Sequence, residues 1–184
     1  DALVAPTSGG LVASGALEPI TLLSALAAVT ERIGLIGTAS TTYSLPYTLA
    51  RQFATLDHLS GGRAGWNIVT SWAPSAGLNY GRQSDVGHQE RYAMAEDFLQ
   101  AVDALWRSFP ANAVVDDRSQ GVYAHAHLLK PVRHQGPYVQ VQGPLNVPGS
   151  PQGRPVYVQA GQSDDGRAFA GRWAEVIFTA HLNK

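Results

Sequence analysis

The chain has 184 residues with a formal net charge of −1, and 45% of them are hydrophobic, as in an ordinary globular domain. So small a charge provides no basic field, which argues against nucleic acid or an anionic membrane surface as a main partner. The absence of cysteine excludes disulfides and thiolate metal sites, and it fits the reducing cytoplasm, where we expect the protein. No apolar run approaches the roughly 20 residues that span a bilayer.

The first half of the chain alternates between helical and strand patterns. A helix is predicted over residues 18–32, and the strand-like run 33–42 follows it. A second helix begins at Pro46 and ends at Gly61, because glycine adopts the positive φ of a helix stop at little cost. The short apolar run 64–71 is the next strand. Short connections between such elements indicate parallel βα units with right-handed crossovers.

The middle of the chain contains one strong helix between two irregular segments. Residues 72–87 carry three glycines and no periodicity, and as a loop after a strand's carboxyl end they form a candidate lid. Residues 88–106 have a continuous apolar stripe at helical spacing. Residues 107–154 are expected to be an insertion with a short strand pair. The irregular spacing of their histidines and aspartates favours solvated loop residues over a metal site.

The last part of the chain repeats the alternation. Strands are predicted at 155–161 and 175–180, with a helix between them whose N-cap is Ser163. Together with 33–42 and 64–71, these strands predict an α/β fold with a parallel sheet.

Polar side chains are expected to gather where these strands end, because ligands of parallel α/β proteins bind at the carboxyl edge of the sheet. The candidate cofactor-binding residues are Thr38, Ser40, Asn67, His88, Tyr92, Gly161 and Ser163. They are mostly neutral hydrogen-bonding groups, which suit a phosphate-bearing cofactor whose own ring does the chemistry. Simpler roles stand beside this one, since strands favour threonine and Ser163 can serve as a cap alone. Asp164 and Asp165 would repel a phosphate unless they point away.

No Ser-His-Asp order, P-loop, GxGxxG or His/Cys cluster is present, and no pair of carboxylates has a clear acid and base assignment. The sequence therefore assigns no catalytic residue and no metal.

Four long runs carry a family resemblance that covers nearly the whole chain. They are EPITLLSALAAVTERIGLIGTAST, LARQFATLDHLSGGRAGWNIVTSW, HQERYAMAEDFLQAVDALW and GPLNVPGSPQGRPVYVQAGQSDDGRAFAGRWAEVIFTA. In this order they resemble the flavin-dependent monooxygenases of the nitrilotriacetate, EDTA and dibenzothiophene-sulfone type, within the bacterial-luciferase-like superfamily.

The resemblance implies a (β/α)8 TIM barrel that uses O2 and reduced FMN, delivered by a separate NAD(P)H:flavin reductase, to put one oxygen atom into a small organic substrate. It also implies roles for the candidate residues. Tyr92 and Ser163 would hold the phosphate, Thr38 and Asn67 would face the isoalloxazine ring, and His88 would lie near the ring or the ribityl chain. As in superfamily relatives, a non-proline cis peptide is expected at 39–40 or 40–41.

A full barrel has eight βα units and typically about 250 residues, whereas four barrel strands are predicted here. By the resemblance, two strands, the second with a flavin-contacting aspartate, would precede Asp1 and two would follow Lys184. Residues 1–184 are therefore expected to be an internal part of a single TIM-barrel domain, a partial barrel whose open edges favour a homo-oligomer. Two alternatives remain: a non-catalytic fragment that packs against a partner chain, and a deazaflavin-dependent oxidoreductase on the same fold.

Overall fold

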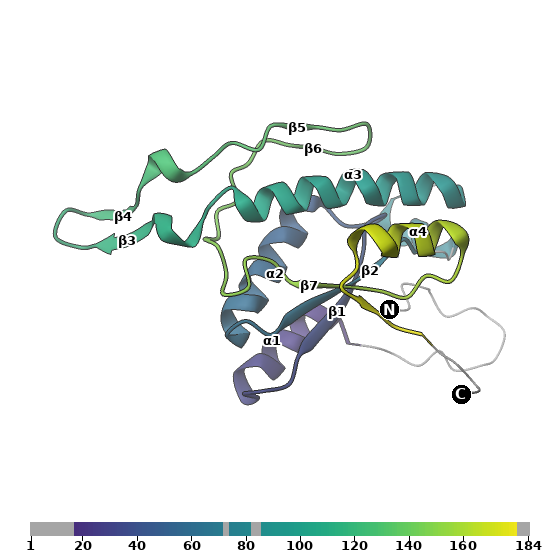
Figure 1. The fold of residues 1–184 in the computed structure, drawn as a ribbon, viewed down its shortest axis with the longest axis horizontal. Helices are drawn as coiled ribbons and strands as arrows, with labels where there is room; N and C mark the ends of the chain where they lie inside the picture. The colour runs from purple at the N-terminus through teal and green to yellow at the C-terminus, as the bar shows by residue number, and fades with distance from the viewer. Residues whose placement is uncertain (1–16, 72–73, 82–85, 180–184) are drawn as a thin grey trace.

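The computed structural model describes residues 17–71, 74–81 and 86–179 (Figure 1). The α-helices are α1 (Pro19–Val29), α2 (Pro46–Ser60), α3 (His88–Arg107) and α4 (Asp164–Trp173). The strands are β1 (Leu35–Ser40), β2 (Ala64–Val69), β3 (Val114–Asp117), β4 (Val122–Ala124), β5 (His134–Gln135), β6 (Gln140–Val141), β7 (Val156–Gln159) and β8 (Val176–Ile177). Short 3-10 helices are η1 (Pro74–Tyr80), η2 (Ala111–Ala113) and η3 (Ala126–Leu128).

The main sheet has the strand order β1-β2-β7-β8, and each neighbouring pair is parallel. The predicted α/β fold with four parallel strands is thus confirmed, although every strand is shorter than its predicted range. Strand β8 is the shortest, with two residues. Each strand is joined to the next through a helix, as in consecutive units of a TIM barrel.

The helices pack on one face of this sheet, and Trp66 in β2 is the centre of the contact. Its buried ring lies 5.7 Å from Phe53 of α2 and 6.1 Å from Phe98 of α3, between ring centroids. Alternation along β2 therefore turns its other residues, Gly65, Asn67 and Val69, to the opposite face. That face would line the interior of a barrel.

The joint between α2 and β2 is fixed by a buried carboxylate. Gly61, at φ 64°, ends α2 in the left-handed conformation that the sequence predicts. Asp57, fully buried one turn earlier, accepts hydrogen bonds from the backbone amide of Ala64 at 3.2 Å and from that of Gln152 at 3.0 Å. One side chain thus connects the helix end, the start of β2 and the loop that leads to β7.

Residues 107–154, which precede β7 in the chain, contain two hairpins. The β3–β4 hairpin projects away from the body of the molecule, and the β5–β6 hairpin lies along α3 (Figure 1). Asp97 of α3 holds the second hairpin: it pairs with His134 at 2.6 Å and accepts the backbone amides of Tyr138 and Val139 at 2.8 and 2.9 Å. His134 is therefore part of the contact that holds this hairpin to α3.

The prediction of a cis peptide at 39–40 or 40–41 is wrong. Among the described residues the cis peptide bond is Gly143–Pro144. The 39–40 and 40–41 bonds are trans because the chain continues as a paired strand through them, with the Thr41 amide bonded to the Val69 carbonyl at 2.9 Å. In the described part of the chain, no helix is both long and apolar enough to cross a membrane.

Candidate functional site

Thr38 and Asn67 form the first part of the candidate site. They are register partners on β1 and β2, on the sheet face that carries no helix. The Asn67 amide nitrogen donates a hydrogen bond to the Thr38 hydroxyl oxygen at 3.0 Å. The Asn67 carbonyl oxygen Oδ1 is buried and has no hydrogen-bond partner among the described residues. An unpaired buried acceptor is costly, so this position is suited to a ligand that brings an N–H or O–H donor.

Ser40 lies two residues after Thr38, closer to the carboxyl end of β1, and its hydroxyl is bonded to neighbouring residues. It is buried, and its hydroxyl accepts hydrogen bonds from the Ser71 hydroxyl at 2.8 Å and from the Thr42 amide at 3.2 Å. Ser71 has a φ of 47°, a conformation that non-glycine residues rarely adopt. Ser40 thus fixes the turn that follows β2 and is not itself open to a ligand.

A hollow of about 330 Å³ opens at the carboxyl ends of β2 and β7. His88 and Tyr92, from the first two turns of α3, line it together with Gly161 and Ser71. The structure therefore brings three of the candidate residues into one concave site. Thr38, Ser40, Asn67 and Ser163 are not in its wall, but Ser71 connects the hollow to Ser40 through the hydrogen bond above.

The Tyr92 hydroxyl is held between two glycines of the β7–α4 loop and the first turn of α4. A Cβ atom at Gly161 would lie 3.0 Å from the Tyr92 oxygen, and one at Gly166 would lie 2.8 Å from it. A side chain at Gly166 would therefore displace the phenol, and one at Gly161 would crowd it. Ser163 caps α4 as predicted, and its hydroxyl oxygen accepts the Gly166 amide at 3.1 Å. Tyr92 and the N-terminus of α4 thus meet in a small polar cradle, the kind of site that suits phosphate.

The two aspartates beside this cradle are each paired with a basic group. Asp165 Oδ2 lies 3.0 Å from His88 Nδ1, and Asp164 contacts the Arg167 guanidinium. The Arg167 guanidinium partly offsets the charge of Asp164, and Asp165 is fixed by its contact with the His88 ring. His88 is also placed by this contact, and its ring lies against Tyr92 with centroids 5.2 Å apart.

Ser71, Asp165 and Gly166 are not among the candidate cofactor-binding residues. The contacts of Ser71 with Ser40 and of Asp165 with His88 are made across the fold, and the sequence has no local signal for these pairings. Gly166 could have been found, because a glycine inside a helical pattern often has a packing reason, here the close approach of Tyr92. Tyr43 after β1 stacks on Tyr80 of η1 at 4.9 Å, which ties part of the 72–87 excursion to the same edge of the sheet. Residues 72–73 and 82–85 of that candidate lid lie outside the described residues.

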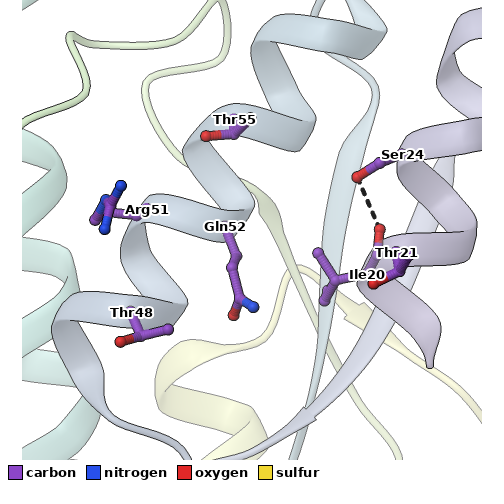
Figure 2. A pocket seen from close by; sticks show the side chains of 7 residues that line it. All are labelled: Ile20, Thr21, Ser24, Thr48, Arg51, Gln52 and Thr55. Atoms are coloured by element: carbon purple, nitrogen blue, oxygen red, sulfur yellow. Dashed lines mark hydrogen bonds between the residues drawn. The ribbon is translucent and has the colours of Figure 1, made fainter.

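A second hollow, of about 410 Å³, lies between α1 and α2 on the helical side of the sheet (Figure 2). Its wall is formed by Ile20, Thr21, Ser24, Thr48, Arg51, Gln52 and Thr55. The Ser24 hydroxyl is already bonded to the Ile20 carbonyl at 2.8 Å, and most of the other side chains are exposed. None of the candidate residues lies in it, so this groove is separate from the site at the strand ends.

These residues fit a flavin mononucleotide in two respects. The reduced isoalloxazine ring carries N–H donors, which match the unpaired Asn67 acceptor, and a phosphate matches the cradle of Tyr92 and α4. Asn67 lies two residues before the carboxyl end of β2, and the cradle follows the carboxyl end of β7, the neighbouring parallel strand.

Comparisons with known proteins agree with this fold. The sequence matches the family described as luciferase-like monooxygenase over residues 1–184. It is 52% identical over 163 residues to N-acetyl-S-(2-succino)cysteine monooxygenase of Bacillus subtilis (strain 168), covering 89% of this chain and 37% of that protein. It is also 52% identical over 164 residues to nitrilotriacetate monooxygenase component A of Aminobacter aminovorans, covering 89% of this chain and 36% of that protein.

A solved structure is similar to this chain in both fold and sequence. The crystal structure of riboflavin lyase with modified FMN and riboflavin superposes with a TM-score of 0.87 at 42% identity, over 92% of this chain and 38% of that one. The chain thus spans well under half the length of the relatives it matches. Sequence and structure lead to one conclusion: the chain belongs to the luciferase-like monooxygenase family.

Proposed function

We propose that this chain contributes the flavin site to the oxygenase component of a two-component FMN-dependent monooxygenase. The observation that carries the proposal is the Asn67 carboxamide, whose buried Oδ1 has no partner among the described residues while its Nδ2 is fixed by Thr38. The oxygenase names of relatives at 52% identity support the same reading. Bound reduced FMN would supply the electrons with which O2 is activated.

The residues of this chain would bind and orient the cofactor. Asn67 would accept a hydrogen bond from the reduced ring, with Thr38 holding the amide in the one orientation that leaves Oδ1 open. Tyr92 and Ser163 would hold the phosphate at the start of α4. His88, fixed by Asp165, would lie near the ring or the ribityl chain. Ser40 and Gly161 would shape the site without using a side chain on the ligand.

The proposal includes partners. A separate NAD(P)H:flavin reductase would deliver the reduced FMN, and the word "component" in the name of a relative supports a divided system. The other reactants would be O2 and a small organic substrate. A cytoplasmic location fits the absence of cysteine and the need for reduced nicotinamide.

A homo-oligomer is also proposed, and α1 supports it. This helix exposes Leu22 and Leu26 at 39% and 37% and Val29 at 78%, and their spacing puts these apolar side chains on one face of the helix. Sedimentation of the protein as a stable monomer would count against this part.

The experiment that tests the function is turnover. The protein at its full natural length would be incubated with FMN, NADH and an added flavin reductase, and oxygenated product would be sought by mass spectrometry with 18O2 and a panel of small organic substrates. Incorporation of one 18O atom is expected. If reduced FMN binds and no substrate takes up oxygen, or if only a reduced deazaflavin binds, the monooxygenase assignment is wrong.

A further inference from the structure

A cavity of about 610 Å³ lies at the other end of the molecule from the flavin site. It is formed by the end of α3, the segment that follows it and the loop before β7. Arg154 of this loop precedes β7, whereas Gly161 of the flavin site follows it. Gln152, also in the wall, reaches the Ala64 carbonyl at the start of β2 at 2.9 Å. The cavity is therefore at the amino ends of the strands, separated from the flavin site by the length of the sheet.

Positive charge dominates the wall. Arg107, Lys130 and Arg154 line the cavity, with Asp103 as the one carboxylate among its lining residues. Asp103 contacts Arg107 and lies 4.0 Å from Arg154 Nε. Arg107 is paired with Asp103 and Arg154 with Glu175, whereas the exposed Lys130 makes no ion pair within the described residues, so Lys130 carries the uncompensated positive charge of the wall.

Arg154 is held in place by a two-bond pair with one carboxylate and by a ring contact. Its guanidinium pairs with Glu175 at 2.8 Å and lies 4.2 Å above the centre of the Tyr157 ring. A cation that is already ordered loses little entropy when a ligand binds, which favours binding. Lys130 would then be the group that adjusts to the ligand.

Ser150 supplies a second, independent observation. Its side chain is in the wall of the cavity and the residue is only 7% exposed, yet its hydroxyl has no hydrogen-bond partner among the described residues. A buried hydroxyl without a partner is unfavourable, and an oxygen of a bound anion would satisfy it. Trp106, buried at 5% exposure, gives the same wall an apolar surface.

We propose that this cavity binds a small organic anion, whose carboxylate or phosphate oxygens would be held by Lys130, Arg154 and Ser150 while its apolar part lies against Trp106. The volume is in the range of known small-molecule sites, roughly 300 to 1,000 Å³. The site goes beyond the proposed flavin chemistry and does not depend on it, because no residue is shared between the two hollows.

The test is calorimetric titration of the protein at its full natural length with citrate and, separately, with inorganic phosphate, at ionic strength matched with sodium chloride. FMN is kept saturating, so that its phosphate site is not available to either probe. Saturable binding of citrate, phosphate or both is expected, and the difference between the two assigns the carboxylate or the phosphate class. Lys130→Gln and Ser150→Ala should each weaken binding by about tenfold.

Arg118→Gln is the matched control, because this side chain is 91% exposed on the β3–β4 hairpin and is outside the cavity wall. It should leave the affinity unchanged. Circular dichroism checks that each variant is folded, and FMN affinity should be the same in all three. The proposal is overturned if neither probe binds, or if folded Lys130→Gln and Ser150→Ala bind as tightly as the parent protein.

Discussion

The Asn67 amide nitrogen donates a hydrogen bond to the Thr38 hydroxyl oxygen at 3.0 Å, across the β1–β2 register. This bond decides which end of the carboxamide faces a ligand, because the donor is used and the acceptor is left open. Thr38→Val keeps the shape of the side chain and removes the acceptor. We expect it to lower the free energy of unfolding by about 1 kcal/mol and to weaken FMN binding severalfold.

Chemical denaturation and FMN titration of the same samples measure the two effects of Thr38→Val. Thr55→Val, at an exposed position of α2, makes the same change away from the sheet and should affect FMN affinity very little. Equal FMN affinities for Thr38→Val and the parent protein would show that FMN binding does not need the Asn67 carboxamide to be oriented by Thr38.

Gly166 has room for a hydrogen atom only. An added Cβ would meet the Tyr92 hydroxyl at 2.8 Å and the Gly161 backbone at 3.1 Å, so Gly166→Ala should displace the phenol and weaken FMN binding by about tenfold or more. Gly171→Ala in the same helix is the control, since a Cβ there meets nothing within 4 Å. It should stabilise α4 by up to about 1 kcal/mol and leave FMN affinity unchanged. Similar FMN affinities in the two variants would contradict the proposed cradle.

Gly136 lets the β5–β6 hairpin reach the Asp97 carboxylate. A Cβ at this position would lie 1.8 Å from Asp97 Oδ1, so Gly136→Ala must move either the hairpin or the carboxylate that binds His134. We expect a loss of about 1 to 3 kcal/mol in the free energy of unfolding, measured by urea denaturation. Gly34→Ala, with open space around its Cβ, is the control and should change stability by less. A neutral Gly136→Ala would mean that the hairpin is not held by Asp97.

Glu175 makes stability depend on pH in acid. The hydrogen bond from Arg154 lowers the pKa of the Glu175 carboxyl below its ordinary value of 4.5, more than partial burial raises it, and the Tyr157 amide adds to the lowering. A carboxyl with a lowered pKa stabilises the fold above its unfolded pKa, and this contribution is lost as the pH falls through the folded pKa. Glu175→Gln should therefore be less stable than the parent protein at pH 7.

The stability difference between Glu175→Gln and the parent protein should shrink as the pH is lowered below about 4.5. Thermal unfolding followed by circular dichroism from pH 7 to pH 3 measures it, with Glu31→Gln, at an exposed position, as the control. A difference that stays constant over this range would show that Glu175 carries no such linkage.

Local sequence signals were enough to predict the four helices and the four parallel strands of the main sheet. Helix α3 runs from His88 to Arg107, one residue longer than predicted, because its apolar stripe repeats over many turns. The stop at Gly61 was equally clear. In contrast, η1 was not predicted, since a single short 3-10 helix leaves no repeat in the sequence.

Contacts between distant segments account for what the sequence did not predict. Asp97 is off the apolar stripe of α3 and reads as a solvent-facing residue, but the β5–β6 hairpin covers it. His88 and Asp165 are brought together only by the packing of α4 near α3. The resemblance selected the residues of the candidate flavin site, and the structure adds the contacts that hold Thr38, Ser40 and His88. The sequence does not reveal that the Ser40 hydroxyl accepts a hydrogen bond from the Ser71 hydroxyl.

The most direct test of the flavin site is an anaerobic titration of the protein at its full natural length with reduced FMN, with Asn67→Leu and Asn146→Leu compared side by side. Asn146 is an exposed loop residue and makes the matched change outside the site. We predict saturable binding by the parent protein and by Asn146→Leu, and binding weaker by about tenfold or more in Asn67→Leu, which lacks the acceptor for the reduced ring. Absence of saturable binding by the parent protein, or equal affinities in the two variants, would contradict the proposed role of Asn67.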